Sequence, residues 1–192
     1  SGVTQSTFAV SNAPSGYVPS GMGDVEGDGI SDIILYNTNL NKVMVWFLDS
    51  NGRYRTNLMV NGGVSMSAGW MLRAIGDIDT DGRVDLIWHS SVSRKVAYWI
   101  LNVDGTLMTY GFCTNMPMSA GWSLNASGDI DGAGTVDLLW HHSSTRRVAY
   151  WFLNPDGTLR EAGYCTTNTM AAGWEMKGAG TIGVYGELGI LW

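Results

Sequence analysis

The sequence has few prolines, few cysteines and few charged residues for its length. Only 4 prolines and 2 cysteines occur in 192 residues, and charged residues make up 15%. No apolar run reaches the roughly 18 residues that a membrane-spanning helix needs, and the N-terminus shows no signal peptide. We therefore expect no membrane insertion. With 11 basic and 17 acidic residues the net charge is -6, which argues against a nucleic-acid partner.

Glycine and tryptophan are abundant instead, with 26 and 9 copies, and both follow an internal repeat. The segments GDVEGDGISDIIL, GDIDTDGRVDLIW, GDIDGAGTVDLLW and GTIGVYGELGILW begin at Gly23, Gly76, Gly128 and Gly180. Successive copies are offset by 53, 52 and 52 residues. A V-x-x-W pattern keeps the same step, with its tryptophan at Trp46, Trp99 and Trp151. One supersecondary unit therefore recurs along the chain.

Each repeat has the pattern of short β-strands joined by tight turns, such as Asp104-Gly105. Strands such as VAYWIL are apolar on both faces, so both faces must be covered. We therefore predict an all-β fold, a β-propeller of four-stranded antiparallel blades with about 52 residues each. A single domain, 1–192, would hold three full blades near 16–68, 69–120 and 121–172, and residues 173–192 with 1–15 would form a blade shared by the termini. The sequence leaves open whether the ring closes within one chain or across a homo-oligomer.

The acidic segment and the strand that follows it carry a family resemblance. The pattern D-x-D-x-D-G-x-x-D, followed by an apolar strand and V-x-x-W, resembles FG-GAP/VCBS repeats, and the likeness covers essentially the whole chain. Such repeats occur in integrin α-subunit propellers and in propeller lectins. The resemblance implies that each acidic loop joins the first two strands of a blade and binds calcium.

The residues themselves are consistent with a metal, because oxygen ligands at alternating loop positions suit a hard cation such as Ca²⁺. We expect two calcium sites, and the third loop is left open because Ala133 replaces a ligand there. The fourth loop, within 181–189, should hold no metal. The alternative is that the loops are acidic turns in which aspartates cap the backbone. The expected ligands, with backbone oxygens from Ile30 and Arg83, are Asp24, Glu26, Asp28, Asp32, Asp77, Asp79, Asp81, Asp85, Asp129, Asp131 and Asp137.

A second group of candidates consists of aromatic and imidazole side chains at repeated positions outside the acidic loops. Indole rings stack on sugars, and repetition favours a binder with several weak sites over a single catalytic centre. The alternative places these residues in the core or on a solvated loop face. The candidate ligand-binding residues are Tyr36, His89, His141, His142, Trp70, Trp122 and Trp174.

These observations predict a non-catalytic, calcium-stabilised binding module that acts outside the cell. Its expected partner is a carbohydrate or cell-surface glycoconjugate, which it would bind as a multivalent lectin. A protein–protein adhesion module is the first alternative. A polysaccharide-degrading enzyme or its accessory domain is the second, disfavoured because most carboxylates are committed to the loops. Cys113 and Cys165 recur one repeat apart and are expected as free thiols.

Overall fold

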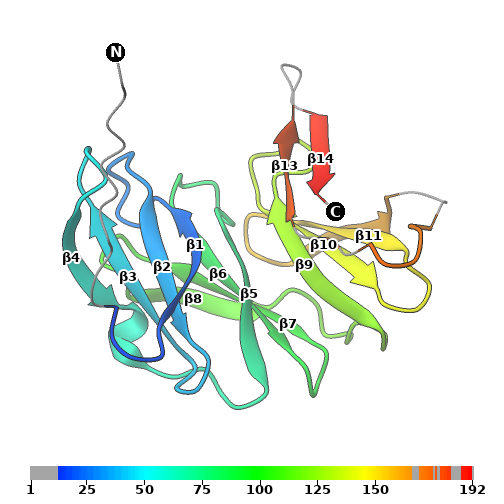
Figure 1. Cartoon of the computed structure of the whole chain (residues 1–192), viewed down its shortest axis with the longest axis horizontal. Coiled ribbons are helices and arrows are strands. Elements are labelled where there is room, and N and C mark those ends of the chain that lie inside the picture. Colours follow the sequence, from blue (N-terminus) through cyan, green and yellow to red (C-terminus); the bar gives the residue numbers. More distant parts are fainter. Residues whose placement is uncertain (1–12, 166–168, 175, 177, 183–186, 192) are drawn as a thin grey trace.

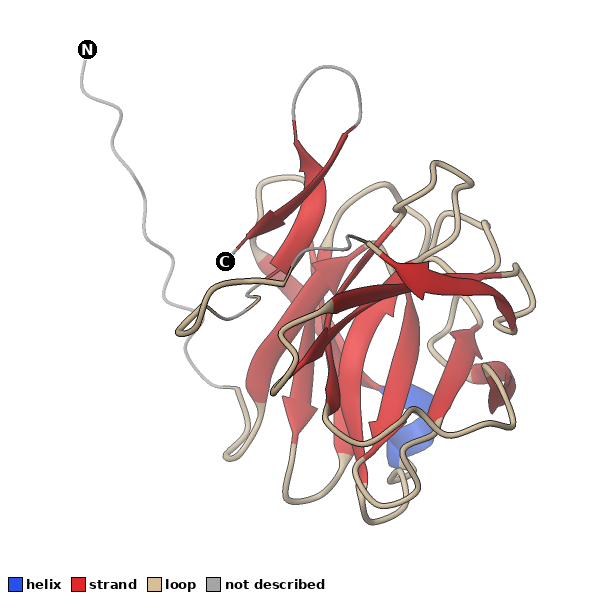
Figure 2. Ribbon diagram, turned by 90° about the vertical axis from the view of Figure 1, so that its right-hand side faces the viewer, coloured by secondary structure: helices blue, strands red, loops and turns tan. Residues whose placement is uncertain are grey.

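The computed structural model describes residues 13–165, 169–174, 176, 178–182 and 187–191. Over these residues the regular structure is almost entirely β, and the only helical element is a 3-10 turn, η1 (Val60–Gly63) (Figure 2). The strands form three four-stranded antiparallel sheets and one two-stranded sheet (Figure 1). The prediction of an all-β fold with four-stranded antiparallel units is confirmed.

Each four-stranded sheet comes from one repeat, and its strands pair in chain order. Sheet 1 contains β1 (Val18–Gly23), β2 (Asp32–Asn37), β3 (Lys42–Leu48) and β4 (Tyr54–Met59). Sheet 2 contains β5 (Trp70–Gly76), β6 (Asp85–Ser90), β7 (Val96–Leu101) and β8 (Leu107–Phe112). Sheet 3 contains β9 (Trp122–Gly128), β10 (Asp137–His142), β11 (Val148–Leu153) and β12 (Leu159–Tyr164).

The fourth repeat is represented by two strands, β13 (Gly178–Ile182) and β14 (Glu187–Leu191), which pair antiparallel. Residues 1–12, which we expected to belong to the same blade, lie outside the described residues, as do residues 183–186 of the fourth loop. The structure thus shows three four-stranded sheets and a two-stranded one. Over the described residues no closed ring of four blades is seen, which differs from the predicted architecture.

The first strands of successive sheets are neighbours in space. β1 contacts β5, β5 contacts β9, and β9 contacts β13. Backbone bonds join the acidic loops at the ends of these strands: the N–H of Val84 donates to the carbonyl of Asp24 at 2.9 Å, and that of Val136 donates to the carbonyl of Asp77 at 2.7 Å. The loops are therefore part of the contact between sheets, as well as turns within them.

Two hydrophobic clusters lie between the sheets, one joining sheets 1 and 2 and the other joining sheets 2 and 3. Trp88 and Trp140 are fully buried, and their rings lie 5.0 Å from Trp99 and 4.9 Å from Trp151. All six residues of β7 are buried, as its two apolar faces predict. Replacing a buried tryptophan with alanine costs about 3–5 kcal/mol, so these repeated indoles are a main source of stability.

Candidate functional sites

The last aspartate of each acidic loop is buried and ties the loop to its sheet. The carboxylate of Asp85 accepts hydrogen bonds from the backbone N–H of Leu101 at 2.9 Å and of Ile78 at 3.0 Å. Asp32 and Asp137 accept the equivalent pair of bonds in sheets 1 and 3. Both oxygens of each carboxylate are used, so this position has a structural role whether or not a metal is bound.

The first aspartate of each loop organises the turn itself. In the second loop, Asp77 accepts bonds from the N–H of Thr80 at 2.7 Å and of Gly82 at 2.8 Å. Gly82 has a φ of 85°, a conformation that glycine adopts without steric cost. The turn therefore folds around the Asp77 carboxylate, as expected if the aspartates of these loops cap the backbone.

Carboxylate oxygens converge in two of the three loops. One oxygen from each of Asp77, Asp79 and Asp85 lies within 4.8 Å of the others, and the equivalent oxygens in the third loop converge in the same way. The third-loop members are Asp129, Asp131 and Asp137. Such oxygen-only clusters match the ligand preference of Ca²⁺. Among the described residues no equivalent cluster is found in the first loop. Calcium binding by any of the three loops stays a prediction.

The other expected ligands have different neighbours. Glu26 forms an ion pair with Arg55, and Asp28 accepts a bond from the N–H of Ile30 at 2.8 Å. Asp81 forms an ion pair with the Arg83 side chain and accepts a bond from the Arg83 N–H at 2.8 Å. These contacts neutralise or occupy carboxylates outside the two converging clusters.

Burial disfavours the ionised form of two carboxyl groups in the second-loop cluster. Burial raises the pKa of Asp85 from 3.8 to about 7, against the opposing effect of its backbone hydrogen bonds. Burial, followed by the charge of Asp81, also raises the pKa of Asp79. Both shifts disfavour the carboxylate form, and a divalent cation between the oxygens would reverse them. The residues of this loop therefore fit a calcium ion.

Tyr36 and His89 occupy the same repeat position, and each side chain packs against the next sheet. Tyr36 is buried, donates its hydroxyl to Asn41, and meets the edge of Trp88 at a centroid distance of 5.9 Å. His89 is partly buried and makes the same kind of edge contact with Trp140 at 5.3 Å. Both residues therefore contribute to the contact between sheets.

His142 and two of the candidate tryptophans also pack within the protein. Trp122 lies 5.0 Å from the His142 ring, whose Nδ1 is within 3.2 Å of the backbone nitrogen of Thr145. Trp70 stacks on Phe112. The candidate that stands most open to solvent is Trp174, with 54% of its surface exposed.

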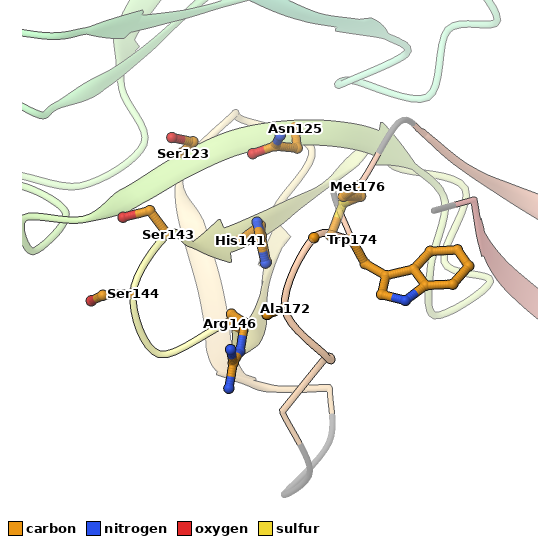
Figure 3. Close-up of a pocket in the computed structure, with 10 residues that line it drawn as sticks. Ser123, Asn125, His141, Ser143, Ser144, Arg146, Ala172, Trp174 and Met176 are labelled. Atoms are coloured by element: carbon orange, nitrogen blue, oxygen red, sulfur yellow. The ribbon is translucent and has the colours of Figure 1, made fainter.

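A pocket of about 570 Å³ lies between sheet 3 and the segment that leads to β13, and it brings two of the candidates together (Figure 3). His141 lies in its wall, while Trp174 stands at its edge with the indole directed away from His141 (Figure 3). The other lining residues are Ser123, Asn125, Ser143, Ser144, Arg146, Ala172, Gly173 and Met176. The Nε of Arg146 is buried and makes no hydrogen bond among the described residues.

Sequence reasoning missed Asn125, although the repeat held a signal for this residue. Asn125 occupies the position that Arg73 fills in the preceding repeat. The shorter side chain leaves room beside His141, whereas Arg73 reaches its own neighbour Met71 with a contact of 3.5 Å to the sulfur. A comparison of the repeats for the positions where they differ would have pointed to Asn125.

Both cysteines are free, as predicted. Cys113 is buried, which raises the pKa of its thiol to about 12, and Cys165 is exposed. The described residues contain no helix with the length and hydropathy that a bilayer crossing requires.

Comparison with known proteins gives a likeness of fold. No protein-family model matches the chain, and no curated protein matches it. A solved structure of a lectin from Agrocybe aegerita, described as specifically recognising non-reducing terminal N-acetylglucosamine, is similar with a TM-score of 0.56 and 16% sequence identity. The match covers 82% of this chain but only 40% of that lectin's length. At this identity the likeness supports a shared all-β architecture.

Proposed function

We propose that this chain is a non-catalytic carbohydrate-binding module, a lectin, and that the pocket beside β9 holds the sugar. The observation that carries the proposal is the pocket itself, about 570 Å³ in volume and lined by hydroxyl, amide, imidazole and guanidinium groups. Pockets of a few hundred Å³ are the usual size for a small ligand. The similarity of the fold to a lectin supports the same class of ligand.

The chemistry of the lining suits a sugar. Ser123 and Asn125 project from β9, and both residues are exposed to solvent. Hydroxyl and amide groups both donate and accept hydrogen bonds, which matches the hydroxyl and acetamido groups of a saccharide. His141 and Arg146 add donors on the opposite wall, and the Arg146 Nε is a buried donor that a ligand oxygen would satisfy. The Trp174 indole at the edge offers an aromatic face to a second sugar unit.

We further propose that calcium has a structural role in this module. Asp77, Asp79 and Asp85 fit the ion best, and binding there would offset the repulsion among their carboxylates. On this account the repeats are of the FG-GAP/VCBS type, the sheets belong to a propeller completed by the ends of the chain or by a second copy, and the protein works outside the cell, where calcium is plentiful. Repeated weak sites would then supply avidity.

Two other functions predict different results. A protein–protein adhesion module would bind its partner without competition from free sugar. A polysaccharide-degrading enzyme would use a pair of carboxyl groups flanking the scissile bond, whereas the pocket presents hydroxyl, amide, imidazole and guanidinium groups.

The experiment is a glycan-array screen of labelled protein, run in calcium and again after chelation, with free sugar as competitor. We expect binding to one class of glycan that the matching free sugar abolishes. If binding survives chelation, the metal contributes to stability and does not contact the sugar. The same conclusion follows if chelation unfolds the protein and binding is lost with the folded state. An array without signal from folded protein would contradict the lectin proposal.

A further inference from the structure

The acidic loops of sheets 1 and 3 each receive an arginine from the fourth strand of the same sheet. Arg55, on β4, forms an ion pair with Glu26 and also lies 3.9 Å from the carboxylate of Asp28. Arg160, on β12, forms an ion pair with Asp131. Arg55 and Arg160 occupy the same repeat position, and so do Glu26 and Asp131. Two loops therefore hold an internal cation at the same ligand position.

Each of these arginines lies over a phenylalanine of the neighbouring third strand. The guanidinium carbon of Arg55 is 5.8 Å from the ring centroid of Phe47, and that of Arg160 is 5.4 Å from the ring centroid of Phe152. A guanidinium within about 6 Å of a ring centroid is attracted to the aromatic face. The ring thus holds the arginine along the sheet, with its charge at the loop.

Sheet 2 has neither residue of this pair. Met108 stands at the arginine position, and Ile100 stands at the phenylalanine position. Asp79, the residue equivalent to Glu26 and Asp131, therefore meets no arginine from β8. It converges instead with Asp77 and Asp85 within 4.8 Å, and the arginine of the second loop pairs with a carboxylate outside this trio.

We infer that the fourth-strand residue determines which loops require a divalent cation. Arg55 and Arg160 take the place of the metal in sheets 1 and 3, and the Met108 sheet keeps one calcium site at Asp77, Asp79 and Asp85. A guanidinium on one ligand carboxylate both occupies one of its oxygens and repels a divalent ion. This inference rests on the proposed structural role of calcium, and it sets the number of ions at one per chain.

The test is a calcium titration of the whole chain by isothermal calorimetry, paired with thermal melts in calcium and in chelator. We expect one site in the wild type. Met108→Arg should weaken calcium binding at least tenfold and raise the melting temperature in chelator, while Met108→Leu should leave both unchanged. Arg160→Met frees a trio of aspartates that already converges, so it should add a second site and make the melting temperature depend more strongly on calcium.

Arg160→Lys, which keeps the charge, should retain one site and serves as the control for loss of structure. A wild type that binds three ions, or Met108→Arg protein that binds as tightly as the wild type, would overturn the inference and leave the calcium proposal standing. A folded wild type that binds no calcium would overturn both.

Discussion

The indole of Trp70 stacks on the ring of Phe112, with centroids 5.9 Å apart and planes 24° from parallel. One repeat later, Trp122 packs on Tyr164 at 6.1 Å. In both sheets the partner is the last residue of the fourth strand. Trp174 occupies the same repeat position ahead of the two-stranded sheet and is 54% exposed at the edge of the pocket. The tryptophan at this repeat position thus packs within the protein in sheets 2 and 3. In the fourth repeat the equivalent Trp174 is open to a ligand.

This difference predicts unequal effects of removing the two indoles. Trp122→Ala should lower the free energy of unfolding by about 2–3 kcal/mol, because a partly buried ring and its aromatic contacts are lost. Trp174→Ala should change it by less than about 0.5 kcal/mol, as surface substitutions usually do. Chemical denaturation followed by circular dichroism measures both values. Equal losses would contradict the assignment of Trp174 to an exposed edge.

The buried aspartates at the end of each loop should be important for stability even without metal. Asp85→Ala leaves the N–H groups of Ile78 and Leu101 without their acceptor, at a cost of about 1–3 kcal/mol each. We expect a clear fall in the melting temperature in chelator. Asp104→Ala, in an exposed turn, is the matched control and should have a smaller effect. If the two variants have the same melting temperature, the hydrogen bonds between Asp85 and its sheet do not stabilise the fold.

His89 should make stability depend on pH in the acidic range. Burial lowers its pKa in the folded protein, and the positive charge of Arg73 lowers it further. The unfolded chain therefore takes up a proton near pH 6.5 while the folded protein does not, and stability falls as the pH drops through that value. Burial of Asp85 acts in the opposite direction, because its raised pKa favours folding at lower pH.

The contribution of His89 is isolated by subtracting the unfolding free energies of His89→Gln from those of the wild type. Between pH 7.5 and pH 5 the wild type should lose more stability than the variant, because only the wild type must keep a partly buried imidazole neutral. Parallel curves for the two proteins would show that His89 titrates in the folded state as it does in the unfolded chain.

The repeat, the strands and the acidic loops could be predicted because each is encoded by neighbouring residues. Two-sided apolar strands such as β7 and turns such as Asp104-Gly105 require only local patterns. The alternation of aspartates likewise predicts a loop with inward oxygens. The same patterns placed the aromatic residues correctly in repeated positions, but they could not separate Trp122, packed on Tyr164, from Trp174 at the pocket edge.

The remaining features depend on how strands pair and how sheets meet. Arg160, on the edge strand β12, pairs with Asp131, in the loop between β9 and β10, across 29 residues of sequence. No local sequence pattern predicts this pair. The pocket likewise forms where β9 and β10 meet residues 172–174 and 176, and Asn125 in its lining replaces the arginine of the previous repeat.

Asn125→Arg gives the most direct measurement of the central claim, because it places in the third repeat the side chain that the second repeat already tolerates at Arg73. Wild-type and variant protein, matched in melting temperature, would be applied to the same glycan array in calcium. We predict that the wild type binds one glycan class and that the variant loses this binding, since its longer side chain fills the space beside His141. Equal binding by the two proteins would contradict the assignment of the sugar to this pocket.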